Sequence, residues 1–319
     1  MDIEENKPKS PAKRTGRSRL FRFGLRSLFV FTTLLALGLG YFNYKYFIVA
    51  NAIKELQDTK CRISFYDSYS SEWEELNLKQ LSAFEKWNHK RAGIEFDPRT
   101  IKSVICGDEL KSLTLFQYFP NIRSIDCNRS FEERKVSLKP LASLSKLESL
   151  YLWAEQISDL EYLANLPKLS HLSIESGSLS DINPLGECAE LKELEISSDN
   201  VSDISCLANL TELFYLGIHS PEVSDVSALS KLNNLTELSI SGTNVDLSPI
   251  AKLPNLTELS IYDTNVSDLS PLAKLPNLEK LFFDHKKTVA PVPLFNANNR
   301  RGSVRAPGFL YLQYYDRQQ

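Results

Sequence analysis

The sequence predicts an α/β repeat solenoid in which short parallel strands stack along the chain. The first observation is a phrase, L-x-x-L-x-[LI], that recurs from Leu147 to Leu278 at spacings of 22, 22, 22, 22, 21 and 22 residues. The second is that most phrases are followed by V/I-S-D and another aliphatic residue. A period of this length indicates a solenoid, because no single repeat can bury its own apolar face and neighbouring repeats must stack.

These repeats resemble those of leucine-rich repeat proteins, and among them the bacterial internalin-like type with 22-residue repeats. The phrase Leu256-Leu259-Ile261 followed by Val266-Ser267-Asp268 carries the likeness most clearly. The resemblance implies a horseshoe with a parallel β-sheet on its concave face, and recognition of a protein or an envelope ligand. In that family an asparagine usually stands eight residues after the opening, whereas this chain has other residues at that position. We therefore expect the buried asparagine ladder to be absent or replaced by hydroxyls.

The N-terminal residues predict a basic head followed by a membrane anchor. Residues 1–26 carry eight Lys or Arg against three acidic residues, a net charge of +5, and are expected to be disordered and cytoplasmic. Residues 27–49 begin with eighteen residues that bear no charge, about 27 Å of helix, which is close to the thickness of a bilayer. A cleaved signal peptide is the competing interpretation. A transmembrane helix would contact lipid and place the rest of the chain in the periplasm or outside the cell.

The remaining chain divides into a cap, a repeat array and a tail. Residues 50–100 are predicted to form a juxtamembrane capping region that covers the first core layer. Residues 101–288 hold two degenerate repeats that open at Ile101 and Ile122, about six regular repeats and a partial one, with a short polar insertion at residues 130–136. Residues 289–319 contain Pro and Asn clusters and are expected to form a C-terminal tail or cap.

The five cysteines give no metal-ligand spacing. Cys106 and Cys127 each lie five residues after an opening, at an inward position. Two interpretations stay open for them: small apolar core residues, or a disulfide across neighbouring strands.

The strand periodicity also predicts which side chains face solvent. Positions three and five after each opening point into the core, so positions two, four and six point outward and form three columns. The outward positions combine aromatic and acidic residues, which suits a binding surface for a basic protein, although ordinary solvated strand residues would give a similar composition. The candidate partner-binding residues are Tyr151, Trp153, His171, Glu175, Glu193, Glu195, Tyr215, Glu237, Glu258 and Tyr262. His171 and His219 are expected on this face as unpaired histidines.

The periodic aspartates have a structural explanation. Asp159, Asp181, Asp203, Asp225 and Asp268 lie twelve residues after an opening, and Asp246 eleven after one. Such an array could be a calcium site or a set of catalytic acids, but its period matches the fold. We expect these residues to cap a short helical turn on the convex side.

No motif for catalysis, for a cofactor or for a metal is present in the sequence. The sequence therefore favours a non-enzymatic, membrane-anchored protein that presents a ligand-binding surface outside the cytoplasm and does not bind nucleic acid. The alternatives are a self-associating structural protein of the cell envelope and a scaffold that faces the cytoplasm. The oligomeric state cannot be deduced from these patterns.

Overall fold

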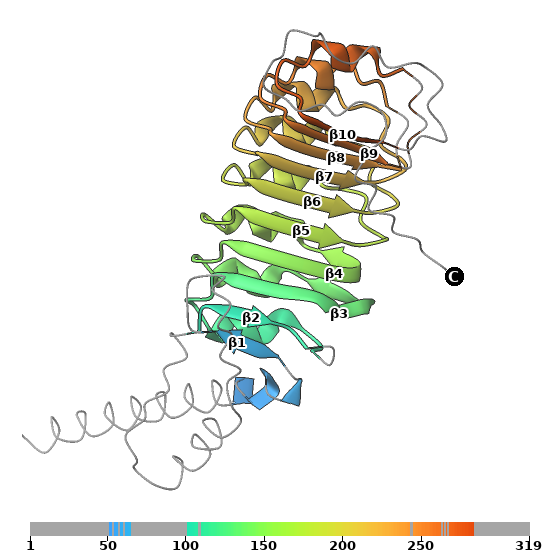
Figure 1. Ribbon diagram of the computed structural model, residues 1–319. Coiled ribbons are helices and arrows are strands. Elements are labelled where there is room, and N and C mark those ends of the chain that lie inside the picture. Colours follow the sequence, from blue (N-terminus) through green and yellow to red (C-terminus); the bar gives the residue numbers. More distant parts are fainter. Residues whose placement is uncertain are drawn as a thin grey trace, which may run out of the picture. The chain divides into compact units, whose positions relative to one another are not determined.

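The structure is a computed structural model that describes residues 51–52, 54–56, 58–59, 61–64, 101–107, 110–242, 245–262, 264, 266 and 268–283. All of them belong to one compact unit, Val49–Gln319. Their strands form a ten-stranded sheet in the order in which they occur in the chain (Figure 1). The strands are β1 (Arg62–Ser64), β2 (Ser103–Ile105), β3 (Ser124–Ser137), β4 (Ser149–Ser158), β5 (His171–Glu175), β6 (Glu193–Ser197), β7 (Tyr215–His219), β8 (Glu237–Ser241), β9 (Glu258–Tyr262) and β10 (Lys280–Phe283).

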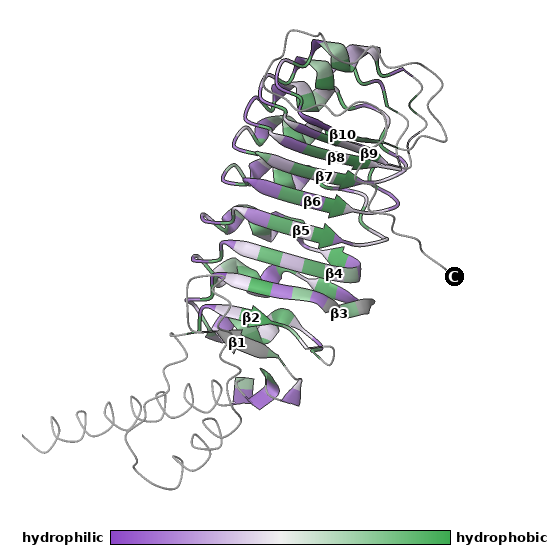
Figure 2. Ribbon diagram, viewed as in Figure 1, coloured by the Kyte–Doolittle hydropathy of each residue, from purple (hydrophilic) through white to green (hydrophobic). Residues whose placement is uncertain are grey.

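The predicted parallel sheet is confirmed. Each strand from β2 to β10 pairs in parallel with the next, and the regular repeats align so that Leu172 lies beside Leu194 and Leu194 beside Leu216. The third and fifth positions are buried in every phrase except the last, as in Leu194 at 0% and Ile196 at 1% exposure, whereas Leu281 and Phe283 are partly buried. Apolar and polar residues accordingly alternate along the strands (Figure 2). The aliphatic side chains form one continuous core behind the sheet.

Short helical segments lie on the opposite side of the core from the sheet (Figure 1). In the described repeats they are 3₁₀ helices of three to six residues. Helical runs this short are usually 3₁₀ rather than α. The segments are η2 (Leu113–Tyr118), η3 (Lys139–Ser143), η4 (Leu160–Asn165), η5 (Asn183–Glu187), η6 (Ser205–Asn209), η7 (Ser227–Lys231), η8 (Ile250–Lys252) and η9 (Ser270–Lys274).

The periodic aspartates accept hydrogen bonds from the backbone at or just before the beginnings of these segments. Most stand one residue before the N-cap, as Asp203 does before Ile204, and Asp246 stands three residues before the N-cap of η8. In four repeats a carboxylate oxygen accepts a hydrogen bond from the backbone N–H of the serine two residues later, at 2.8 to 2.9 Å. The N-cap itself is an aliphatic residue such as Ile204. Asp159 is different: it is itself the N-cap of η4, has φ of 67°, and makes no side-chain cap bond. Its carboxylate instead accepts a hydrogen bond from Ser137 Oγ.

We expect these caps to make stability depend on acid pH. Hydrogen bonds from the following serines lower the pKa values of Asp203, Asp225, Asp246 and Asp268 below the ordinary value of 3.8. Because the unfolded chain binds protons more readily, the stabilisation is present above that value and is lost as the pH falls below about 4. Changing all four residues to Asn keeps the acceptor oxygen and removes the titration. Urea midpoints measured from about pH 6 to pH 3 should fall less in this variant; parallel curves would contradict the interpretation.

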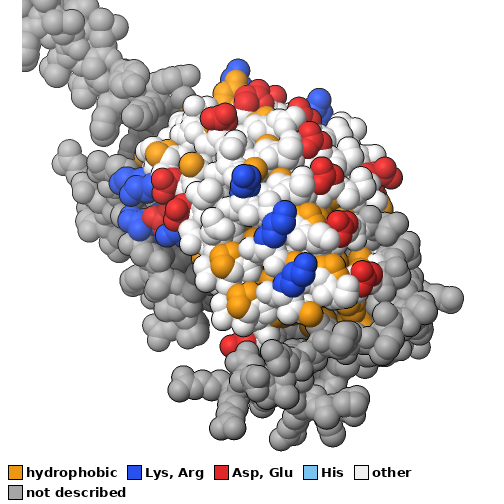
Figure 3. Space-filling model, turned by 90° about the horizontal axis from the view of Figure 1, so that it is seen from above, with side chains coloured by type: hydrophobic (Ala, Val, Ile, Leu, Met, Phe, Trp, Pro, Cys, Tyr) orange, Lys and Arg blue, Asp and Glu red, His pale blue; other side chains and the backbone are white. Residues whose placement is uncertain are grey.

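Charged side chains form ordered rows on the surface. Lys231, Lys252 and Lys274 lie in the last turns of η7, η8 and η9, whereas the capping aspartates precede the first turns. In the face that Figure 3 shows, acidic side chains form a row beside a row of basic ones. The three lysines lie at the ends of helical segments whose partial negative charge they oppose.

A hydroxyl ladder replaces the asparagine ladder, as one of the two sequence-based alternatives predicted. Ser176, Ser198 and Ser220 are buried seven residues after their openings, one position earlier than the family's asparagine. Each Oγ donates to a carbonyl of the preceding repeat, at 3.0, 2.5 and 2.6 Å. Each backbone N–H donates to a carbonyl of the following repeat. The ladder therefore satisfies buried polar groups and joins successive turns.

The N-terminal end of the sheet is irregular. β1 pairs antiparallel with β2, in contrast to the other strands. β3 contains two register shifts against β4, between Cys127 and Phe131 and between Phe131 and Lys135. The predicted polar insertion is therefore part of a strand, and Phe131 within it is fully buried. Cys106 and Cys127 form a disulfide, which decides between the two interpretations left open by the sequence.

Several sequence predictions lie outside the described residues. They concern the basic head 1–26, the membrane segment 27–49, most of the cap 50–100 and the tail 289–319. Within the described part of the chain, no helix has the length and apolar character needed to cross a membrane. The domain boundaries thus stay predictions.

Candidate binding surface on the sheet

The open sheet face consists of the side chains at the second, fourth and sixth positions after each opening, on the side of the sheet away from the 3₁₀ segments. All ten candidate residues from the sequence lie on it. In-register pairing makes each position a column that runs across the strands. The columns therefore bring together residues that lie one repeat apart in the chain.

Five candidate residues are consecutive neighbours in the second-position column. The pairing places them in the order His171, Glu193, Tyr215, Glu237 and Glu258. His171 Nε2 lies 3.5 Å from Glu193 Oε1. At the other end of the column, Lys280 Nζ forms an ion pair of 2.6 Å with Glu258. Tyr215 thus stands between two carboxylates on strands β6 and β8.

A second group crosses the columns at Gly217. Glu195 and Gly217 are partners in the fourth-position column, and His219 follows Gly217 by two residues on β7. His219 Nε2 lies 3.6 Å from Glu195 Oε1, while its Nδ1 lies 2.7 Å from Ser241 Oγ. A Cβ at Gly217 would approach Glu195 Cγ to 3.2 Å, so the glycine leaves the space through which the two side chains meet.

The prediction of unpaired histidines is therefore wrong for both His171 and His219. The sequence correctly predicted that both histidines lie on the same face of the sheet. Each of them, however, contacts a glutamate of a neighbouring strand. The physical reason is the close spacing of parallel strands, about 4.8 Å, which lets a long outward side chain reach a residue of the neighbouring strand in its own column or in the adjacent one.

The pKa values of Glu195 and Tyr215, at the centre of the face, are shifted by their neighbours. The interaction with His219 is the largest cause that lowers the pKa of Glu195, and a hydrogen bond from Ser173 Oγ at 3.3 Å lowers it further, although partial burial raises it. Burial raises the pKa of Tyr215, and the charges of Glu195, Glu237, Glu193 and Glu258 raise it further. The four surrounding carboxylates therefore disfavour a negative charge on the tyrosine.

The other candidate residues lie toward the two ends of the face. Tyr151 and Trp153 share β4, and Trp153 pairs in register with Glu175. Tyr262 lies at the opposite end, on β9, with 43% of its surface exposed. The structure thus joins seven residues in a central group around Tyr215 and separates the remaining aromatics from it. The central group is defined as His171, Glu193, Glu195, Tyr215, His219, Glu237 and Glu258.

Sequence reasoning missed three contributors to this group. Gly217 and Ser173 occupy outward positions but have no large side chain, and Ser241 orients His219. The repeat period could have identified them, because each residue falls in the same outward columns as the candidate residues. Small residues in an outward column mark the places where longer neighbours converge.

No metal or substrate chemistry emerges from the described residues. Among them, no group of three or more His, Cys, Asp or Glu side chains could hold a metal ion. A pocket of about 490 Å³ lies beside η2 and η3, away from the open sheet face, and its lining includes Lys111, Lys135 and Lys139.

Comparisons with known proteins agree with the repeat and the fold. A family model described as "Leucine Rich repeats (2 copies)" matches residues 254–296. An internalin (inlF) from Listeria monocytogenes is similar at 27% identity and a TM-score of 0.53, over 64% of this chain and 61% of that one. Internalin C2 from Listeria monocytogenes is similar at 27% identity and a TM-score of 0.50, over 59% of this chain and 82% of that one.

The chain spans about 61% of the length of the first internalin, and no curated protein matches it in a sequence search. The repeat period, the parallel sheet and the two solved structures together support an internalin-like leucine-rich repeat protein.

Proposed function

We propose that the protein is a non-enzymatic binding protein that holds a basic segment of a partner protein on its open sheet face. We further propose that residues 27–49 anchor it in a membrane, with the N-terminus in the cytoplasm and the repeats outside it. The likeness to internalin-like repeats supports binding as the general role. The observation that carries the proposal is the setting of Tyr215 among four glutamates.

The chemistry of the central group favours a cationic ligand. The ring of Tyr215 is half buried and flanked on both sides by carboxylates of the same column, while Glu195 lies in the adjacent one. An arginine or lysine side chain placed over the ring would gain a cation–π contact and a charge partner at once. The other glutamates would steer a basic segment towards the face.

The arrangement of the columns also suits an extended ligand. The second-position column runs from His171 to Lys280 across six strands. At about 4.8 Å per strand this row is about 24 Å long, which matches roughly seven extended residues. Aromatic side chains at Trp153 and Tyr262 lie near the ends of the face, where they could contact residues that flank the basic segment.

We expect Tyr215→Ala to weaken binding of a cationic peptide by about tenfold or more, because a central aromatic contact is lost. The probe is a fluorescent octa-arginine peptide, titrated against full-length protein in a zwitterionic detergent. Tyr162→Ala is the matched control, since Tyr162 is a partly exposed tyrosine in η4 on the other side of the core. Equal losses in both variants would contradict the assignment.

Two further variants separate the parts of the proposal. Glu237→Gln should reduce both the affinity and its dependence on salt, whereas Glu161→Gln in η4 should change neither. Tyr151→Ala with Trp153→Ala tests the end of the face near β4, and should weaken binding less than Tyr215→Ala. If only this double variant weakens capture, the site lies at β4 instead.

The proposed topology has its own test. Tags at the two ends of the chain are exposed to protease in intact cells and in lysed cells. The C-terminal tag should be cleaved when only the outer compartments are opened, while the N-terminal tag stays protected. Protection of the C-terminal tag together with the cytoplasm would instead favour a cytoplasm-facing scaffold.

A further inference from the structure

Three cysteines lie side by side at the first three strands: Cys61 directly precedes β1, Cys106 directly follows β2, and Cys127 is in β3. The antiparallel register places Arg62 opposite Ile105, so one step further places Cys61 opposite Cys106. The parallel register places Ile105 beside Asp126, so the same step places Cys106 beside Cys127. Cys106 therefore has a cysteine on each side, and it is bonded to Cys127 with a Cα–Cα distance of 4.8 Å.

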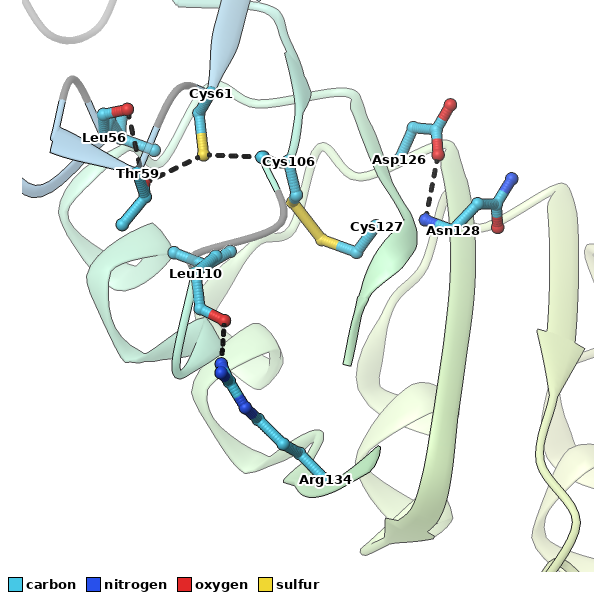
Figure 4. The surroundings of a disulfide bond; sticks show 10 residues. Leu56, Thr59, Cys61, Cys106, Leu110, Asp126, Cys127, Asn128 and Arg134 are labelled. Carbon is cyan, nitrogen blue, oxygen red and sulfur yellow. Dashed lines mark hydrogen bonds between the residues drawn. A yellow bond between two sulfur atoms is a disulfide. The ribbon is translucent and has the colours of Figure 1, made fainter. Parts of the chain in front are cut away.

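The thiol of Cys61 is held beside this disulfide. Its Sγ accepts a hydrogen bond of 3.2 Å from the backbone N–H of Gly107, the residue after Cys106. A second contact of 3.2 Å joins Sγ to Thr59 Oγ1. Figure 4 shows both contacts and the Cys61 sulfur lying between Thr59 and the chain at Cys106. Two independent contacts thus fix the sulfur on the side of β1 that faces the disulfide.

We propose that Cys61 is a second bonding partner for Cys106, so that β1 can be joined covalently to the first repeat by thiol–disulfide exchange. Directly opposite residues in antiparallel strands have Cα atoms about 4.5 to 5.5 Å apart. Disulfides form over Cα distances of about 4.4 to 6.8 Å. This spacing places Cys61 in the range of Cα distances over which a disulfide to Cys106 can form, as Cys127 is at 4.8 Å.

The exchange is balanced without an added oxidant. The Cys61 thiol gives its proton to solvent, and the thiolate attacks the Sγ of Cys106. The bond between Cys61 and Cys106 forms as that between Cys106 and Cys127 breaks. The electron pair of the broken bond goes to Cys127, which leaves as a thiolate and takes up a proton. Burial is the main cause that raises the pKa of Cys61, which favours its protonated thiol form. The structure contains the bond between Cys106 and Cys127.

The two bonds have different mechanical consequences. The bond between Cys106 and Cys127 has a sequence separation of 21 and closes a loop within the first repeats. A bond between Cys61 and Cys106 would enclose residues 62–105 and attach β1 to β2. Without it, β1 is held to β2 by non-covalent contacts, among them the pairing along Arg62 to Ser64 and the hydrogen bond from Gly107 to Cys61. Exchange would therefore replace a cross-link between the first two repeats by a cross-link between β1 and the first repeat.

The test maps disulfides in full-length Cys127→Ser after oxidation by glutathione disulfide, with free thiols alkylated before digestion and mass spectrometry. We expect a peptide that links Cys61 to Cys106 and the loss of Cys61 alkylation. Cys188 and Cys206, which are free thiols elsewhere in the array, should stay alkylated. Cys61→Ser is the matched control and should keep the bond between Cys106 and Cys127.

The proposal is overturned if Cys61 and Cys106 both stay alkylated in Cys127→Ser under conditions that fully form the disulfide in Cys61→Ser. If Cys127→Ser loses its circular dichroism signal, the wild-type protein decides. It is incubated with a trace of reduced glutathione in mildly alkaline buffer, quenched with acid and mapped. Linked Cys61–Cys106 peptides in excess over any pair that contains Cys188 or Cys206 support the exchange, and no such excess refutes it.

Discussion

Phe131→Ala is expected to lower the free energy of unfolding by about 3–5 kcal/mol, because a fully buried aromatic side chain would be replaced by a cavity. Phe131 lies between the two register shifts of β3, where extra residues of the strand enter the space between the first repeats. Val136 and Leu138, which follow in the same segment, are also buried. Urea unfolding followed by far-UV circular dichroism would measure the loss.

The control for this variant is Lys135→Ala, in the same irregular segment but exposed to solvent. It should change stability by less than about 0.5 kcal/mol. A comparably small effect for Phe131→Ala would mean that the segment is not part of the core, and that β3 ends near Cys127.

The second large effect is expected for Leu216→Ala, at about 2–5 kcal/mol. Leu216 occupies the third position of its repeat, on the central strand β7, and is 0% exposed. The matched control is Leu281→Ala, which removes the same side chain from the same position of the last described repeat. Leu281 is only partly buried, so its loss should cost less. Equal losses of stability in the two variants would show that the third position contributes as much in the last described repeat as in the centre of the array.

The repeat period determined which residues face inward and outward, and this part of the prediction held because spacing alone decides it. Leu194 and Ile196 are buried and Glu193 and Glu195 face outward, as alternation along a strand requires. The same rule placed all ten candidate residues on one face. It also placed Cys106 and Cys127 in one column, but whether their side chains bond depends on rotamers that a period does not specify.

The errors occur where the chain leaves the period or where side chains reach between repeats. Phe131 lies outside the repeat phrase, so it was counted with a polar insertion. The longer β4 pairs with the extra residues of β3, and Asp159, which directly follows β4, has φ of 67°. The contact between Glu195 and His219 depends on the missing side chain of Gly217, which alternation alone does not reveal.

The agreement between strand order and chain order has a consequence for how this protein folds. Each parallel strand of the regular repeats finds its partner 21 or 22 residues away, so no pairing there waits for a distant part of the chain. Loop closure over such distances has a low entropic cost, and nearest-neighbour coupling lets structure begin in any stable repeat and spread in both directions. A partly synthesised array can therefore acquire native pairing before its C-terminal repeats exist.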